Sequence, residues 1–254
     1  MSKIAITGSA SGIGRETARQ LAEQGHEIIG LDLRHADIEV DLSTSDGRQQ
    51  AIEGVLAECG GVLDGLVTAA GLGGHLEDGG LVATVNYFGT VDLLDGLFPT
   101  LSKSEDARVV AVSSNSAQMG DNTDNPIVLA LLENDHAKAM ELIGDLPAAA
   151  TYGLSKHAVS RAVRVRAAEW GAAGVRLNAI APGMTETPLF AGSRDHPELG
   201  ERVKQIPIPL ERYAQPEEIA RVICLMMGDE FAYMHGSVVW LDGGTDALIR
   251  PQGF

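Results

Sequence analysis

The chain has 254 residues, of which 44% are hydrophobic, and a formal net charge of −16 at pH 7. This length suits one α/β domain over residues 1–254, and the negative charge argues against nucleic acid and anionic membranes as partners. Two cysteines are too few for a disulfide framework, no Cys/His spacing indicates a metal site, and without a leader-like segment or a long apolar run we expect a cytoplasmic protein.

The first predicted element is a buried strand at residues 3–7, which runs into the stretch TGSASGIG and a helix over residues 15–24. Glycine permits a tight turn and lets backbone amides approach a pyrophosphate at the positive end of the following helix. A simple strand-to-helix turn would use the same residues, but strand, turn and helix together favour a nucleotide site. The residues that we expect to contact the nucleotide here are Gly8, Ser11, Gly12, Ile13 and Gly14.

A second strand is predicted at residues 26–32, and it ends in Asp32. A carboxylate about 20 residues beyond the glycine turn can accept hydrogen bonds from the adenosine ribose and would repel a 2′-phosphate. The sequence therefore predicts NAD rather than NADP as the cofactor. Asp32 could instead merely end the strand, and Arg34, two positions later, could still accept a phosphate.

A short strand at residues 38–40 precedes Asp41 and Leu42, two further candidates for the cofactor site. Asp41 could meet the adenine amino group, or it could be a loop or helix-capping acid. After an amphipathic helix over residues 45–59, a buried strand over residues 63–69 ends in small residues, against which a cofactor could lie. These small residues include Ala70 and Gly71.

A helix over residues 80–97 contains Asn86 among apolar neighbours, and a strand over residues 109–112 delivers Ser113 and Ser114. An asparagine in such a place needs a hydrogen-bonding reason, either a structural bond or a water relay. Ligands of open parallel sheets sit beyond the carboxyl ends of the strands. One of the two serine hydroxyls should therefore face the cleft.

Residues 115–150 interrupt the alternation of strands and helices. They begin with a polar turn, GDNTDNP at residues 120–126, and continue with a predicted helix over residues 127–144 that has one acidic and one apolar face. We expect this insert to pack near the cleft.

A helix is predicted from Thr151 to Trp170, with Tyr152 and Lys156 near its start. A step of four residues places the two side chains on nearly the same face, one turn apart. An ammonium roughly 4–5 Å away would favour the phenolate by about 2–3 pKa units, which suits a proton carrier at neutral pH. Two residues alone would also fit an ordinary surface helix, so this interpretation depends on the rest of the site.

A strand over residues 175–180 leads into APGMTETP. Residues 184–210 then contain several prolines and little periodicity, which is typical of a mobile lid. A helix over residues 215–227 and a strand over residues 237–241 complete the predicted elements. The cofactor contacts that we expect in this region are Pro182, Gly183, Thr185 and Thr187.

Together these motifs, in this order, resemble the short-chain dehydrogenase/reductase family along essentially the whole chain. The resemblance implies one doubly wound domain with seven parallel strands, ordered 3-2-1-4-5-6-7, that binds a nicotinamide dinucleotide. Tyr152 would be the proton donor or acceptor, and Lys156 would lower its pKa and hold the nicotinamide ribose. Ser114 would hold the substrate oxygen, Asn86 would keep a water in a proton relay, and Thr185 would fix the carboxamide.

Two departures from the family pattern are informative. Thr68 and Ala69 stand where the family usually has asparagines, so the central strand must be braced by other hydrogen bonds. The insert separates Ser114 from Tyr152 by many more residues than in most members. This insert, together with the stretches VNYFG, IAPGMTETPL and LDGG, makes the chain resemble the bacterial 3α-hydroxysteroid dehydrogenase/carbonyl reductase branch. It resembles the aryl (coniferyl-type) alcohol dehydrogenases less closely.

The leading hypothesis is NAD-dependent interconversion of a secondary alcohol and a ketone on a bulky apolar substrate, with a hydroxysteroid as the best candidate. A 3-oxoacyl-carrier reductase is disfavoured because its carrier partner is acidic and this chain has no surplus of basic residues. An alternative of another class is a regulator that senses the dinucleotide without turning it over. We expect a homodimer through the last helix and strand, because the insert should obstruct the family's usual tetramer contact. Side chains that could cover the substrate, or could simply pack in the core, are Met119, Met184, Leu189 and Phe190.

Overall fold

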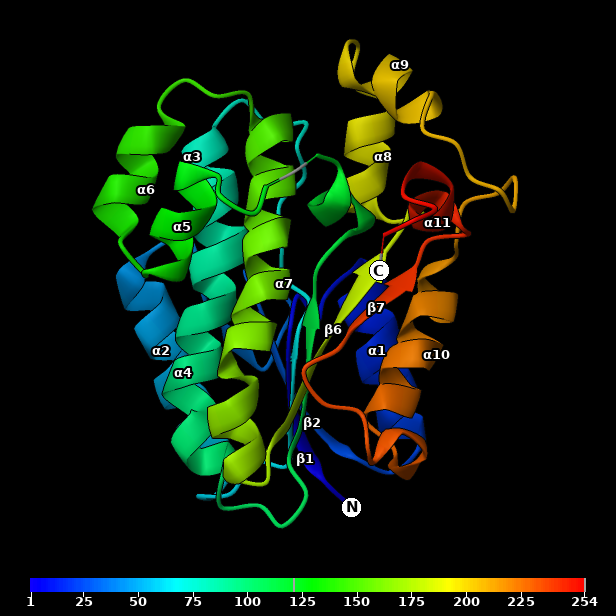
Figure 1. The fold of residues 1–254 in the computed structure, drawn as a ribbon. Helices are drawn as coiled ribbons and strands as arrows, with labels where there is room; N and C mark the ends of the chain where they lie inside the picture. The colour runs from blue at the N-terminus through cyan, green and yellow to red at the C-terminus, as the bar shows by residue number, and fades with distance from the viewer. Residues whose placement is uncertain (121, 254) are drawn as a thin grey trace.

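Seven parallel strands form one sheet in the order β3-β2-β1-β4-β5-β6-β7 within residues 1–120 and 122–253, which the computed structural model describes (Figure 1). This strand order confirms the expected fold class. Asp121, in the predicted polar turn, and Phe254, at the end of the predicted domain, lie outside the described residues. The strands are β1 Lys3–Thr7, β2 Glu27–Asp32, β3 Ile38–Glu39, β4 Gly65–Thr68, β5 Arg108–Val112, β6 Arg176–Pro182 and β7 Val238–Leu241.

Helices cover both faces of the sheet (Figure 1), which explains why its strands read as continuous apolar runs. Successive side chains of a strand point to opposite faces. Ile4 and Ile6 of β1 accordingly pack in one core with Leu21 and Ile223, whereas Ala5 belongs to the core on the other face. The first face carries α1 Gly12–Glu23 and α10 Pro216–Met226, and the second carries α2 Ser45–Glu58, α4 Gly89–Leu101 and α7 Ala148–Ala172.

The helix predicted around Asn86 has three consecutive parts, which are α3 Gly79–Ala83, the π-helix η1 Thr84–Phe88 and α4. Asp78 begins it by accepting a hydrogen bond from the Leu81 N–H at 2.9 Å. A π-helical turn inside an α-helix is rare and frequently marks a functional site. Here the π-helical turn contains Asn86.

The single helix predicted over residues 127–144 is wrong, because the insert forms two helices, α5 Pro126–Leu132 and α6 His136–Ile143. Asn134 lies between them with φ of 56°, a left-handed conformation that ends α5. Asp135 then caps α6 by accepting a hydrogen bond from the Lys138 N–H at 3.0 Å. The break lets both short helices bury apolar side chains in the core that contains α7.

The segment over residues 184–210 is also more regular than the expected loop, since it contains α8 Pro188–Arg194 and α9 Leu199–Lys204. The Thr187 hydroxyl begins α8 by accepting a hydrogen bond from the Phe190 N–H at 3.2 Å. Helices of only six or seven residues show little periodicity, which hides them in the sequence. The chain continues through α10, the 3-10 helix η3 Asp229–Phe231, β7 and α11 Thr245–Ile249.

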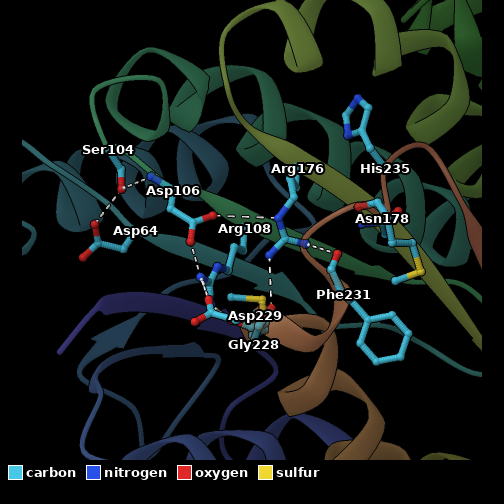
Figure 2. Close-up of polar contacts among 12 residues, drawn as sticks. Asp64, Ser104, Asp106, Arg108, Arg176, Asn178, Gly228, Asp229, Phe231 and His235 are labelled. Atoms are coloured by element: carbon cyan, nitrogen blue, oxygen red, sulfur yellow. Dashed lines mark hydrogen bonds and ion pairs between the residues drawn. The ribbon is translucent and has the colours of Figure 1, made fainter.

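A cluster of arginines and aspartates fixes the amino ends of β5 and β6 to the segment after α10 (Figure 2). Arg108 donates to the Met227 carbonyl and pairs with Asp106 and Asp229. Arg176 donates to the Phe231 carbonyl at 3.0 Å. These cations satisfy carbonyls at and beyond the end of α10, and they tie this end of the sheet to that segment.

None of the helices in the described ranges combines the length and the apolar character that a membrane-spanning segment requires.

Candidate active site

A cavity of about 590 Å³ opens at the carboxyl ends of the strands, where open parallel sheets bind their ligands. Most of the predicted site residues line it. Of that predicted set, Gly14 and Asn86 lie outside the lining. The predicted residues that line the cavity are Gly8, Ser11, Gly12, Ile13, Asp32, Asp41, Leu42, Ala70, Gly71, Ser114, Tyr152, Lys156, Pro182, Gly183, Thr185 and Thr187.

Two glycines in the turn between β1 and α1 could not be replaced by a residue with a Cβ. A Cβ on Gly14 would lie 2.2 Å from the Gly8 carbonyl oxygen, and one on Gly8, whose φ is 70°, would lie 2.8 Å from the Ala70 nitrogen. The Ala70 N–H in turn donates to the Thr7 hydroxyl at 3.0 Å, which braces β4 where the family pattern uses asparagines. The result is a cradle at the positive end of α1, which fits a pyrophosphate.

The carboxylate of Asp32 is held in place at the end of β2. One oxygen accepts from the Ala10 N–H at 3.0 Å and the other from the Leu33 N–H at 2.7 Å. Asp41 accepts from the Ser43 N–H at 2.9 Å, so it orders its own turn beside the cavity. Two carboxylates therefore border the part of the cavity next to the glycine turn, which disfavours an additional phosphate there.

Ser114 and Tyr152 both line the cavity, at the end of β5 and the start of α7, and Ser114 is close enough to lower the pKa of the Tyr152 phenol. The neighbouring Ser113 hydroxyl instead donates to the Lys156 carbonyl at 2.8 Å, so Ser113 fastens β5 to α7. Lys156 is buried, and its Nζ donates to the Val112 carbonyl at 2.8 Å. Of the two serines, Ser114 is thus the one available to a ligand.

The pKa of Tyr152 is raised above its ordinary value, because burial disfavours the phenolate more than the hydrogen bond with Ser114 favours it. Burial also lowers the pKa of Lys156 to about 8. Burial therefore dominates the pKa of Tyr152 in this structure, and the expected lowering of that pKa by the ammonium stays a prediction. The contact that does stabilise the phenolate comes from Ser114.

Asn86 is completely buried in the π-helix, and its amide uses both ends. Its Oδ1 accepts from the Leu72 N–H at 2.7 Å, and its Nδ2 donates to the Leu72 carbonyl at 3.1 Å and to the Ser155 hydroxyl at 3.3 Å. Gly71 lies close to Asn86: a Cβ on Gly71 would lie 3.0 Å from Asn86 Oδ1, so Asn86 would have to shift slightly to admit a side chain there. Asn86 thus holds the loop after β4 against α7. Of the two roles expected for it, a structural bond or a water relay, these contacts correspond to the structural bond.

The residues after β6 form the base of the cavity beneath α8. Gly183 leaves no space for a side chain, since a Cβ would lie 2.6 Å from Asp242 Cα. Thr185 donates to the Gly183 carbonyl at 3.0 Å, and Thr187 donates to the Thr185 carbonyl at 3.3 Å. The Thr187 methyl also lies 3.2 Å from the position of a Cβ on Gly12, so the segment that leads into α8 touches the glycine turn.

The remaining wall of the cavity is apolar and comes from the loop after β4, α3, η1, the segment after β5, and α8 and α9. Met119, Met184, Leu189 and Phe190, which could have been core residues, all line it. The other apolar side chains of this wall include Leu72, Leu81, Val85, Leu199, Val203 and Ile206. A bulky apolar ligand fits this composition.

Two residues near the cavity have roles that the sequence patterns did not indicate. The His75 ring packs against Gly73 and Gly192, and its Nδ1 lies 3.2 Å from the Ser193 hydroxyl, which links the loop after β4 to α8. The Ser116 hydroxyl donates to Ser114 at 3.0 Å. The glycines around His75 and the third serine in SSNS were the available signals, but neither spacing specifies a contact by itself.

Comparison with known families and proteins agrees with this arrangement. A family model described as short chain dehydrogenase matches residues 2–125, and one described as Enoyl-(Acyl carrier protein) reductase matches residues 138–246. A 3-alpha-hydroxysteroid dehydrogenase/carbonyl reductase from Comamonas testosteroni is 44% identical over 100% of both chains. A 3-oxoacyl-[acyl-carrier-protein] reductase from Thermotoga maritima is 27% identical over 94% of this chain and 95% of its own.

Among solved structures, a 3-alpha-hydroxysteroid dehydrogenase from Pseudomonas sp. B-0831, complexed with NADH, superposes with a TM-score of 0.97. It is 45% identical to this chain, and the match covers 100% of both chains.

Proposed function

The chain belongs to the short-chain dehydrogenase/reductase family, and we propose that it is an oxidoreductase that interconverts a secondary alcohol and a ketone with NAD. The observation that carries this proposal is the meeting of Ser114, Tyr152 and Lys156 at one cavity with the glycine turn and Asp32. A proton carrier and a dinucleotide cradle are both needed for this reaction. The solved relative complexed with NADH supports NAD as the cofactor.

Bound NAD supplies the acceptor for the hydride of the alcohol, or NADH its donor for the ketone. Gly8, Gly12 and the amino end of α1 would hold the pyrophosphate, and Asp32 would accept hydrogen bonds from the ribose. Thr185 would hold the carboxamide. These residues fit the cofactor because Gly8, Gly12, Asp32 and Thr185 all line the same cavity, with the glycine turn at the amino end of α1.

The chain's own groups move the proton. Tyr152 would take the hydroxyl proton of the alcohol at its phenol oxygen, or return it to the ketone, while Ser114 holds the same substrate oxygen. Lys156 would keep a positive charge close to the site, and Asn86 would keep the loop beside it in place. We also propose that α8 and α9 form a lid that excludes water from this reaction.

A 3α-hydroxysteroid or a related bulky carbonyl compound is the substrate that we propose. The apolar wall supports it, as does the Comamonas testosteroni relative, whose description includes both activities. The test is a panel of 3α-hydroxysteroids, aryl alcohols and 3-oxoacyl thioesters with NAD and NADP, read by nicotinamide absorbance. Steroid turnover with NAD at a kcat/KM at least tenfold above the rest is expected. NADH binding without turnover of any compound would indicate a dinucleotide-sensing regulator instead.

A homodimer through α10 and β7 is the proposed assembly. The short helices α5 and α6 of the insert accompany α7 on its side of the sheet (Figure 1), where many family members form a second contact. The edge strand β7 keeps all four of its residues only half-buried, which leaves it free for such an interface. Light scattering should give twice the chain mass, and a stable tetramer would contradict this assembly.

Buried free cysteines at Cys59 and Cys224 fit the proposed cytoplasmic location.

A further inference from the structure

The oxygen of Ser114 accepts two hydrogen bonds from a single neighbouring residue. The Ser116 N–H donates to it at 3.2 Å and the Ser116 hydroxyl donates at 3.0 Å. Ser114 is only 8% exposed, and it is the N-cap residue of the 3-10 helix η2, Asn115–Gln118. These two contacts therefore act on a buried hydroxyl at the reaction site.

A serine hydroxyl has one proton to donate and two sites at which it can accept. With both accepting sites occupied by Ser116, the only remaining function of the Ser114 hydroxyl is to donate its proton. Ser114 lowers the pKa of the neighbouring Tyr152 phenol, which is the direction expected for a hydroxyl that donates toward the phenol oxygen. Hydrogen bonds in a chain also strengthen one another, so donation by Ser116 increases donation by Ser114.

The turn that carries Ser116 is fixed against α7. The Ala117 N–H donates to the Ser114 carbonyl at 3.1 Å, and the Ala117 carbonyl lies 2.7 Å from the His157 Nδ1. On the facing helix, a Cβ on Gly153 would be in ordinary van der Waals contact with the Ser116 carbonyl oxygen, at 3.5 Å. The backbone of the turn that carries Ser116 is therefore held next to α7.

We propose that Ser116 is a positioning residue of the reaction, which keeps the Ser114 hydroxyl as a hydrogen-bond donor, toward Tyr152 before the substrate binds and toward the substrate oxygen afterwards. Ser116 acts only through Ser114. The inference rests on the proposed function, because the substrate oxygen and the proton of Tyr152 belong to that reaction.

The experiment compares Ser116→Ala, which keeps the backbone donor and loses the hydroxyl donor, with Ser116→Thr, which keeps both. Loss of one such hydrogen bond should lower kcat for alcohol oxidation about fivefold and leave KM for NAD within about twofold. The limb of the kcat profile that reports deprotonation should move to higher pH. Ser116→Thr should restore both the rate and the profile.

Two further measurements separate positioning from packing. In a double-mutant cycle, Ser116→Ala should slow the wild type but leave Ser114→Ala unchanged, because its effect passes through Ser114. Near-ultraviolet absorbance of the protein without substrate should show Tyr152, isolated by subtraction of Tyr152→Phe, ionising at higher pH in Ser116→Ala. An unmoved profile in an active enzyme, additive losses in the cycle, or failure of Thr to rescue would each overturn the inference. An inactive wild type would instead contradict the proposed function.

Discussion

Replacement of Asn86 by alanine tests how the loop after β4 is held beside the site. The change removes hydrogen bonds of 2.7, 3.1 and 3.3 Å from a side chain with no exposed surface. Each bond contributes about 1 kcal/mol, and partially buried groups of Leu72 that lose their partners add to this cost. The free energy of unfolding should therefore fall by about 2–4 kcal/mol in urea titrations followed by circular dichroism.

Asn178→Ala is the matched control for this change. Asn178 is 1% exposed, donates to the Met234 carbonyl at 2.8 Å and accepts from the Ser237 N–H at 3.1 Å, and it lies near the arginine cluster (Figure 2). Both variants should lose stability, but only Asn86→Ala should lower kcat/KM, by at least tenfold. A loss below about 0.5 kcal/mol for Asn86→Ala, or equal activity in the two variants, would refute the assigned role.

Three other substitutions probe the cofactor cradle and the buried cation. Gly14→Ala should weaken NADH binding at least tenfold in fluorescence titrations and destabilise the fold, because its Cβ would lie 2.2 Å from the Gly8 carbonyl oxygen; binding within twofold of wild type would contradict this. Asp32→Ser should lower the ratio of kcat/KM for NAD to that for NADP at least tenfold, since a carboxylate repels a phosphate at about 4 Å by several kcal/mol at an effective dielectric of about 20. An unchanged ratio would mean that residues other than Asp32 determine the preference for NAD over NADP. Lys156→Met should abolish turnover and remove a pH dependence of stability. With the pKa of Lys156 lowered to about 8 from the ordinary 10.5, the unfolded wild type binds more protons than the folded form between these values. Wild-type stability should therefore rise by about 3 kcal/mol relative to the variant as pH increases through this range, and parallel curves would contradict the buried cation.

Local patterns were sufficient to predict the sheet and the side of it that binds ligands. Runs such as residues 3–7 and 109–112 are apolar because both faces of a parallel sheet are buried, and that pattern does not depend on distant contacts. The glycine turn and Asp32 could be placed at the carboxyl ends of the strands because they follow β1 and end β2, whereas Tyr152 was assigned to the site through the family resemblance. Most of the predicted site residues therefore line one cavity.

The differences arise where tertiary contacts override the pattern. Apolar spacing continues through residues 127–144, but Asn134 in a left-handed conformation and the Asp135 cap divide the helix. The helical spacing of Tyr152 and Lys156 could not reveal that Lys156 is buried, or that its Nζ donates to the Val112 carbonyl. Proximity along a helix sets which groups are neighbours, whereas their pKa values depend on burial and on partners from other elements.

The Tyr152→Phe variant tests the central claim most directly, because it removes one oxygen from the meeting point of β5 and α7. Alcohol oxidation with NAD should fall at least 100-fold, within the range that general acid–base catalysis contributes, while NADH binding stays within about threefold. Oxidation that survives with less than a tenfold loss would show that the proton is carried by another group.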